Sequence, residues 1–327
     1  MRYIIRRVLL LLLTGWAALT INFALPRLMP GSPIQVMAAK YTGRLTPSAL
    51  AAIAQALGLK NKQNVFVQYW TYLGHTLTGN FGYSLSEYPT KVSTLLAQNL
   101  PWTLGLVGFA TVVAFVLGTF IGAVAAWRRG SLFDSIVVPT GMMLAAMPSF
   151  WISTMAIYFL SYKLGWFPLF GGSSSGSLTS VAGLGSILSH AALPAMVLAV
   201  ISLGGFMLVM RNTTVSVMSD DYVKFARAKG LRNFTVASRY AARNATLPVV
   251  TNFALALGTV VAGTIFVEYV FSYPGIANLL YIAVTSEDYP LMQAIFLVIV
   301  LAVLLANFVA DMLYVVLDPR IRVGGRA

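Results

Sequence analysis

Residues 219–248 read SDDYVKFARAKGLRNFTVASRYAARNATLP and form a polar stretch between two long apolar runs. Six of the chain's 22 Lys and Arg residues lie in it. The SDD triplet at 219–221 supplies side-chain oxygens where a helix would begin, and Gly230 can adopt the left-handed conformation that ends one. The stretch therefore predicts a short helix over residues 221–229.

A second helix is expected after this bend. Asn233 can cap it, Arg239 and Arg243 lie four residues apart on one face, and Pro248 fits the first turn of the next apolar run. The pattern predicts a hairpin of two short helices. A solvated cytoplasmic loop, held near anionic lipid by its charges, is the alternative interpretation.

Small residues favour a protein partner over a lipid one. Ala226, Ala228 and Gly230 would let another protein approach the backbone closely, and the basic residues around them offer charge to the rim of that partner. A loop that only faced lipid headgroups would not need small residues at these positions.

The segment DYVKFARAKGL, at 221–231, resembles the cytoplasmic loop typical of the membrane-spanning subunits of bacterial ABC importers, in the form found in oligopeptide and dipeptide permeases. In that family the short helix, called the coupling helix, lies in a groove on the ATPase subunit. The general pattern is Glu-Ala-Ala, three residues, then Gly, whereas here KFA at 224–226 precedes Gly230. It also has a Pro where this chain has Arg243, with Pro248 five residues later. Both departures resemble the peptide-permease variant.

The resemblance assigns an ATPase contact to nine residues. They are Asp221, Tyr222, Lys224, Ala226, Arg227, Ala228, Lys229, Gly230 and Leu231. It implies an all-α, six-helix permease of the type I ABC importer fold, which pairs with a related second permease, two ATPase subunits and an extracytoplasmic substrate-binding protein. ATP and Mg would bind to the ATPase partners, and this chain would hold no cofactor. Peptides are the expected cargo, with oligosaccharides or nickel, carried by relatives, as alternatives.

Further motifs extend the resemblance over nearly the whole chain. They are PGSP at 30–33, GNFGYS at 79–84, FSYPG at 271–275, DYP at 288–290 and LDPRIR at 317–322.

Composition places the chain in a bilayer. Of its 327 residues, 58% are hydrophobic and 9% are charged, which is more apolar surface than one soluble core can hide. The net charge of +13 does not indicate nucleic-acid binding, because the basic residues lie at the ends of apolar runs and no nucleic-acid-binding motif accompanies them. The chain has no cysteine, which excludes disulfides and thiolate metal sites.

Six apolar runs predict six transmembrane helices in one membrane domain, 1–327. They cover 8–25, 101–127, 135–162, 191–210, 247–271 and 290–317. The first run follows three arginines, like a signal peptide. It is long for a signal-peptide core, and no small-x-small cleavage site follows it, so an uncleaved first span is expected.

The distribution of basic residues predicts the topology. Lys and Arg follow the second, fourth and sixth runs, and they are nearly absent from the loops 163–190 and 272–289. The positive-inside rule then places both termini and the loop 211–246 in the cytoplasm of a bacterium with an inner membrane. Residues 26–100 become an extracytoplasmic insertion, and we expect them to form part of the docking surface for a binding protein.

The insertion is expected to be partly helical. Thr46, Pro47 and Gly58 bracket one helix, and residues 65–77 form an aromatic-rich second one. Residues 87–100 carry leucines at helical spacing, which predicts a third helix along the outer membrane interface.

Two features inside the spans bear on packing and transport. Gly118 and Gly122, four residues apart, predict a smooth helix face for a neighbouring helix. Methionines precede the breaker Pro148, which indicates either core packing or a gate for varied side chains. The candidate pathway residues are Met143, Met147, Ser149 and Trp151.

Ion-coupled transport and catalysis find little support. Glu268 and Asp311 are the ionisable candidates within the spans, and both are expected near helix ends where water reaches them. The chain has no HExxH, GxSxG or Walker A motif, and His75 and His190 have no acidic partner near them in sequence. A non-catalytic transport subunit without a metal site is therefore expected. A secondary carrier and a membrane scaffold are the rival interpretations.

Overall fold

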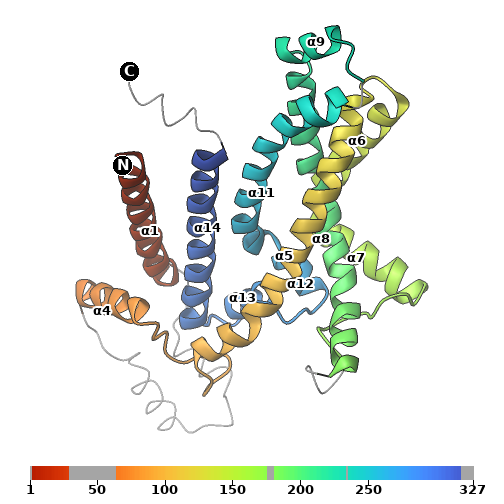
Figure 1. Cartoon of the computed structure of the whole chain (residues 1–327). Coiled ribbons are helices and arrows are strands. Elements are labelled where there is room, and N and C mark those ends of the chain that lie inside the picture. The colour runs from red at the N-terminus through yellow and green to blue at the C-terminus, as the bar shows by residue number, and fades with distance from the viewer. Residues whose placement is uncertain (1, 29–63, 175–179, 233–234, 318–327) are drawn as a thin grey trace, which may run out of the picture. The chain divides into compact units, whose positions relative to one another are not determined.

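The computed structural model describes residues 2–28, 64–174, 180–232 and 235–317 (Figure 1). This part of the chain is helical, and no strand occurs in it beyond an isolated antiparallel bridge between Tyr83 and Lys91. Several predictions fall outside the described residues: the helix 46–58, the turn 30–33, the cap Asn233 and the ending after Leu317.

The helices have the following bounds. In chain order they are α1 (Arg2–Leu28), α4 (Val65–Leu77), α5 (Val92–Trp127), α6 (Leu132–Ala146), α7 (Ser149–Ala156), the π-helix η1 (Ile157–Lys163), α8 (Val181–Val217), α9 (Asp221–Ala228), the π-helix η2 (Val236–Ala242), α11 (Arg243–Gly263), α12 (Ile265–Val270), α13 (Ile276–Thr285) and α14 (Tyr289–Leu317). The chain divides into two compact units, 1–103 with 274–304 and 104–273 with 305–327.

Aromatic and amide contacts hold α4 against α1 in the first unit. The rings of Phe23 and Tyr69 meet edge to face, with centroids 5.1 Å apart, and the hydroxyls of Thr20 and Tyr69 are 2.8 Å apart. Asn22 donates from Nδ2 to the Tyr72 hydroxyl at 3.1 Å and to the carbonyl oxygen of Gln293 at 2.8 Å. The helix predicted over residues 65–77 is thus confirmed, and it packs on the first apolar helix.

A buried carboxylate organises the loop before α5. Asp288 is fully buried, and its Oδ2 accepts hydrogen bonds from the hydroxyl of Ser84 and from both the hydroxyl and the backbone N–H of Ser86. Its Oδ1 accepts from the backbone N–H of Leu291 in the first turn of α14. One carboxylate therefore ties the GNFGYS turn to the start of α14.

Glycines let α8 pack tightly between α5 and α6 in the second unit. A Cβ at Gly118 would lie 2.8 Å from the carbonyl oxygen of Leu203, which is closer than real Cβ contacts. A Cβ at Gly204 would lie 2.4 Å from the carbonyl oxygen of Gly141. The smooth face predicted at Gly118 and Gly122 is confirmed, and the helix that uses it is α8.

Four described helices are long and apolar enough to cross a membrane. They lie at Arg7–Leu25, Val92–Trp127, Val181–Val217 and Tyr289–Ala310. The predicted span 135–162 is a bent pair, because α6 and the α7–η1 segment meet at 101° beside Pro148, and it makes a fifth span if the pair counts as one. The predicted run 247–271 is divided at Thr264 between α11 and α12. The total of six transmembrane helices therefore stays a prediction.

Two prolines that were expected at the start of a helix lie inside a longer one. The separate interfacial helix predicted over 87–100 was wrong, because residues from Val92 belong to the continuous helix α5, with Pro101 inside it. Pro248 was expected in the first turn of a new helix but lies inside α11, which continues from η2. A proline removes one backbone hydrogen bond, and long apolar helices tolerate this loss.

Candidate functional site

The polar stretch 219–248 folds as a helical hairpin, which we call the basic hairpin, beyond the end of α8 (Figure 1). Its first helix, α9, begins after Asp220, whose backbone is extended, and the side chain of that residue makes no capping hydrogen bond. The backbone N–H of Gly230 donates to the carbonyl of Arg227 at 2.9 Å, and Gly230 has φ +77°. The helix therefore ends in the predicted left-handed glycine, whereas the predicted side-chain cap at Asp220 is not made.

The interior of the basic hairpin is a small apolar core. Val223, Ala226 and Val236 are buried against one another, and Val217 at the end of α8 packs on them. Residues 223 and 226 are three apart and share one face of α9. The core therefore joins α9 to the end of α8 and to η2.

The opposite face of α9 is exposed and carries charge. Eight of the nine predicted contact residues are exposed, and Ala226, at 3% exposure, packs inside the hairpin. Lys224 pairs with Asp221 at 2.9 Å, and both side chains remain largely in solvent. The exposed face therefore combines small residues with exposed charges, which suits docking by a protein surface.

Two further residues, which were not among the nine predicted contact residues, belong to the basic hairpin site. Phe225 is 63% exposed, and the Lys229 ammonium lies 4.8 Å from its ring centroid. Asn244, at the start of α11, donates from Nδ2 to the Tyr222 hydroxyl at 2.8 Å. The signal for Phe225 was present in the sequence, because this residue follows Lys224 and lies on the face opposite Val223. Asn244 is 22 residues from its partner, and no local pattern indicated it.

The candidate pathway residues gather around the bend between α6 and α7. Met143 belongs to α6, Met147 is its C-terminal cap, and Ser149 and Trp151 lie in the first turn of α7. Met143 is 61% exposed and Trp151 is 46% exposed, whereas the other two are partly buried. The bend therefore leaves apolar side chains uncovered within this chain.

The expectation that water reaches Glu268 was wrong. Glu268 is fully buried, because α12 packs against α7 and α8 and the following turn folds back, with the Tyr273 N–H donating to the Glu268 carbonyl at 2.8 Å. Burial, together with the nearby Glu268 carboxylate, raises the pKa of the Tyr273 phenol to about 12. The side chain of Asp311 lies outside the described part.

No group of three His, Asp or Glu side chains among the described residues could hold a metal ion.

Comparison with known proteins shows which family this chain belongs to. Residues 118–323 match the family described as the binding-protein-dependent transport system inner membrane component, and residues 1–107 match the N-terminal model of the same kind of protein. The chain belongs to this family. The permease is 36% identical over 340 residues to the di/tripeptide transport system permease protein of Pseudomonas aeruginosa, with 98% of each chain covered. It is 32% identical over 319 residues to the oligopeptide transport system permease protein AppB of Bacillus subtilis, again with 98% of each covered. A putative peptide permease protein of Brucella suis is 35% identical over 325 residues, with 99% of each covered.

Proposed function

We propose that this permease is the membrane-spanning subunit of an ATP-driven importer of peptides and that its basic hairpin docks on an ATPase subunit. The observation that carries the docking proposal is the exposed face of α9, which presents Phe225, small residues and cations around a buried apolar core. The names of the similar full-length permeases, which specify dipeptides, tripeptides and oligopeptides, support peptides as cargo.

The proposed assembly contains a related second permease, two ATPase subunits that bind ATP and Mg, and an extracytoplasmic substrate-binding protein. Both termini and the basic hairpin lie in the cytoplasm, and residues 26–100 contribute to the docking surface for the binding protein. The distribution of Lys and Arg supports this orientation.

In the proposed cycle, closure of the two ATPases on ATP pulls the docked hairpins together. The movement opens the pathway outward, and substrate passes from the binding protein to residues near the α6–α7 bend. Met143 and Met147 suit varied peptide side chains there, because a thioether is flexible and polarizable. Hydrolysis then returns the assembly to its inward-facing state.

Gly230 provides the direct test of docking. A Gly230→Leu variant places a side chain at φ +77° on the exposed end of α9, so it strains the bend and obstructs a docking partner. The purified complex in proteoliposomes, supplied with its binding protein, should retain ATP hydrolysis but lose most peptide uptake. Gly165→Leu is the matched control, since Gly165 has φ +66° and open space around it but lies outside the hairpin. Full uptake by Gly230→Leu would refute the docking role.

One observation favours examining a second function. The buried Glu268 is the kind of group that an ion-coupled carrier uses. A carrier would transport peptide without an ATPase subunit, and a Glu268→Gln substitution would abolish that transport. The importer proposal predicts that an ATPase copurifies with the permease and that uptake stops when this ATPase is inactivated.

A further inference from the structure

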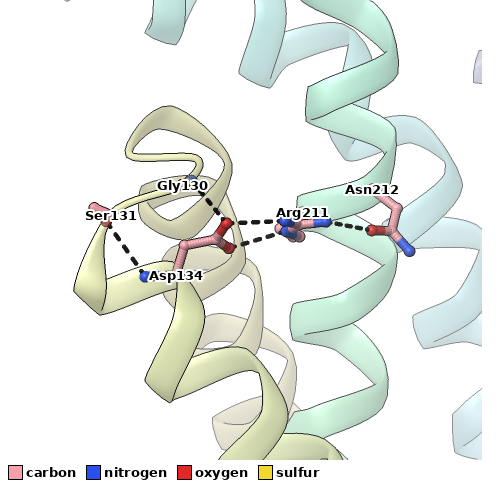
Figure 2. Close-up of polar contacts among 5 residues, drawn as sticks. All are labelled: Gly130, Ser131, Asp134, Arg211 and Asn212. Atoms are coloured by element: carbon pink, nitrogen blue, oxygen red, sulfur yellow. Dashed lines mark hydrogen bonds and ion pairs between the residues drawn. The ribbon is translucent and has the colours of Figure 1, made fainter.

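Arg211 and Asp134 form a bidentate ion pair between α8 and the start of α6 (Figure 2). Nε of Arg211 donates to Oδ1 of Asp134 at 3.0 Å, and Nη2 donates to Oδ2 at 2.9 Å. The Asp134 side chain is 7% exposed and that of Arg211 is 24% exposed. Two parallel charge-assisted hydrogen bonds, largely shielded from water, fix the relative position of the two helices far better than an exposed pair does.

Neighbouring groups hold both partners in place. The backbone N–H of Gly130 donates to Oδ2 of Asp134 at 3.1 Å. The backbone N–H of Asp134 donates to Oγ of Ser131, the N-cap of α6, at 3.4 Å. Nη1 of Arg211 donates to Oδ1 of Asn212 at 3.3 Å. The carboxylate therefore anchors the α5–α6 turn and the arginine at the same point (Figure 2).

The pair lies between the basic hairpin and the α6–α7 bend. Arg211 is six residues before the end of α8, where Val217 packs on the hairpin core. Farther along the same two helices, a Cβ at Gly204 would lie 2.4 Å from the carbonyl oxygen of Gly141, so α6 and α8 touch backbone to backbone there. Helix α6 thus packs along α8, with the ion pair at its start and the glycine contact farther along, and its far end is the bend at Met147.

We propose that the Asp134–Arg211 pair is the joint that makes α6 follow α8 when the basic hairpin moves, so that the movement reaches the α6–α7 bend. The inference rests on the proposed docking of the hairpin. The glycine contact brings the two backbones together, and the ion pair adds two directional hydrogen bonds at the start of α6. Both residues are positioning residues, since neither lies in the hairpin face or among the candidate pathway residues.

The first experiment measures coupling in the complete complex in proteoliposomes. Asp134→Asn and Arg211→Gln should each lower the peptide imported per ATP hydrolysed by about five- to tenfold, within the range that one position in a coupling network contributes. The double variant should lose no more than either single variant, because both substitutions break one pair. Arg128→Gln, which removes an exposed positive charge from the same turn, is the control and should match the parent. Losses that multiply in the double variant, or parental coupling in the single variants, would refute the joint.

The second experiment separates transmission of movement from stability. The chain has no native cysteine, so spin labels can be attached through Ser216→Cys on α8 and Ala146→Cys on α6. In the parent complex the distance between the labels should stay the same with and without trapped ATP, whereas in Asp134→Asn it should change on ATP binding. Identical behaviour of the two complexes would overturn the proposal.

These outcomes are distinguishable from failure of the proposed function. A parent complex that imports peptide without ATP hydrolysis would remove the importer proposal itself. A parent complex that couples normally, together with an equally coupled Asp134→Asn variant, would remove only the joint.

Discussion

Gly122 lies so close to α8 that a Cβ on it would come within 2.4 Å of the carbonyl oxygen of Met207. One turn earlier on α5, Gly118 meets the carbonyl of Leu203 in the same way. Two helices can approach backbone to backbone only where side chains are absent, so this contact fixes the position of α8 against α5. The hairpin and the Asp134–Arg211 pair both depend on the direction of α8.

The first prediction concerns this contact. Gly122→Ala should destabilise the permease by about 1 to 3 kcal/mol, because the added methyl group overpacks a backbone contact. Thermal unfolding of the purified subunit in detergent, followed by fluorescence, measures the loss.

Gly105 on the same helix provides the control. A Cβ there meets no atom within 4 Å, so Gly105→Ala should be neutral or stabilise the helix by up to about 1 kcal/mol. Equal unfolding temperatures for the Gly122→Ala and Gly105→Ala variants would contradict the close contact.

The packing of the spans was partly readable from the sequence. The spacing of Gly118 and Gly122 predicted a contact face on α5, but its partner is α8, and no local signal names a helix more than 80 residues away. Pro148, inside the third run, was identified as a helix breaker, although the run 135–162 was predicted as one span. The angle of 101° depends on how α6 and α7 each pack against α8, which is tertiary information.

The hairpin shows the same limit. Its left-handed glycine and its basic character followed from local chemistry, and α9 begins at the predicted residue although Asp220 makes no side-chain cap. The burial of Ala226 was missed although Val223, three residues earlier on the same face, signals it locally, whereas the third core residue, Val236, lies beyond the bend and no local pattern indicates that it packs there. The prediction that water reaches Glu268 was wrong for a related reason, since the burial of this side chain comes from packing of α12 on helices distant in sequence.

The second prediction addresses the link between α9 and α11. Tyr222→Phe removes the hydroxyl that accepts the hydrogen bond from Asn244 at 2.8 Å, at a cost of about 0.5 to 1.5 kcal/mol. Amide hydrogen exchange in residues 221–228 should become faster, because α9 then opens more easily from α11. Tyr240→Phe is the control, because Tyr240 contacts Tyr222 through its backbone carbonyl, which this substitution keeps, so its exchange pattern should match the parent. Unchanged exchange in Tyr222→Phe would show that the bond does not hold the helix.

The third prediction addresses the outer loop. Asp288→Asn replaces one of two accepting carboxylate oxygens with an NH2 group, which can only donate. Either the Ser84 and Ser86 donors or the Leu291 N–H then lose their acceptor, at a cost of about 1 to 3 kcal/mol. Limited proteolysis should then cut residues 79–91 faster. Glu287→Gln, at the adjacent and less buried position, should leave the cleavage rate unchanged. Parental resistance of the Asp288→Asn loop would mean that the carboxylate does not anchor it.

The fourth prediction uses the two alanines of α9 as a matched pair. Ala226→Leu inserts a larger side chain into the core beside Val223 and Val236, so the hairpin should lose about 1 to 3 kcal/mol and its amides should exchange faster in the isolated permease. Ala228→Leu adds the same volume to the exposed face, so exchange should stay at the parental rate while fewer ATPase subunits copurify. The two variants thus separate folding of the hairpin from docking on it. Full retention of the ATPase by Ala228→Leu would argue against the exposed face as the docking surface, whereas slow exchange in Ala226→Leu would argue against the buried core.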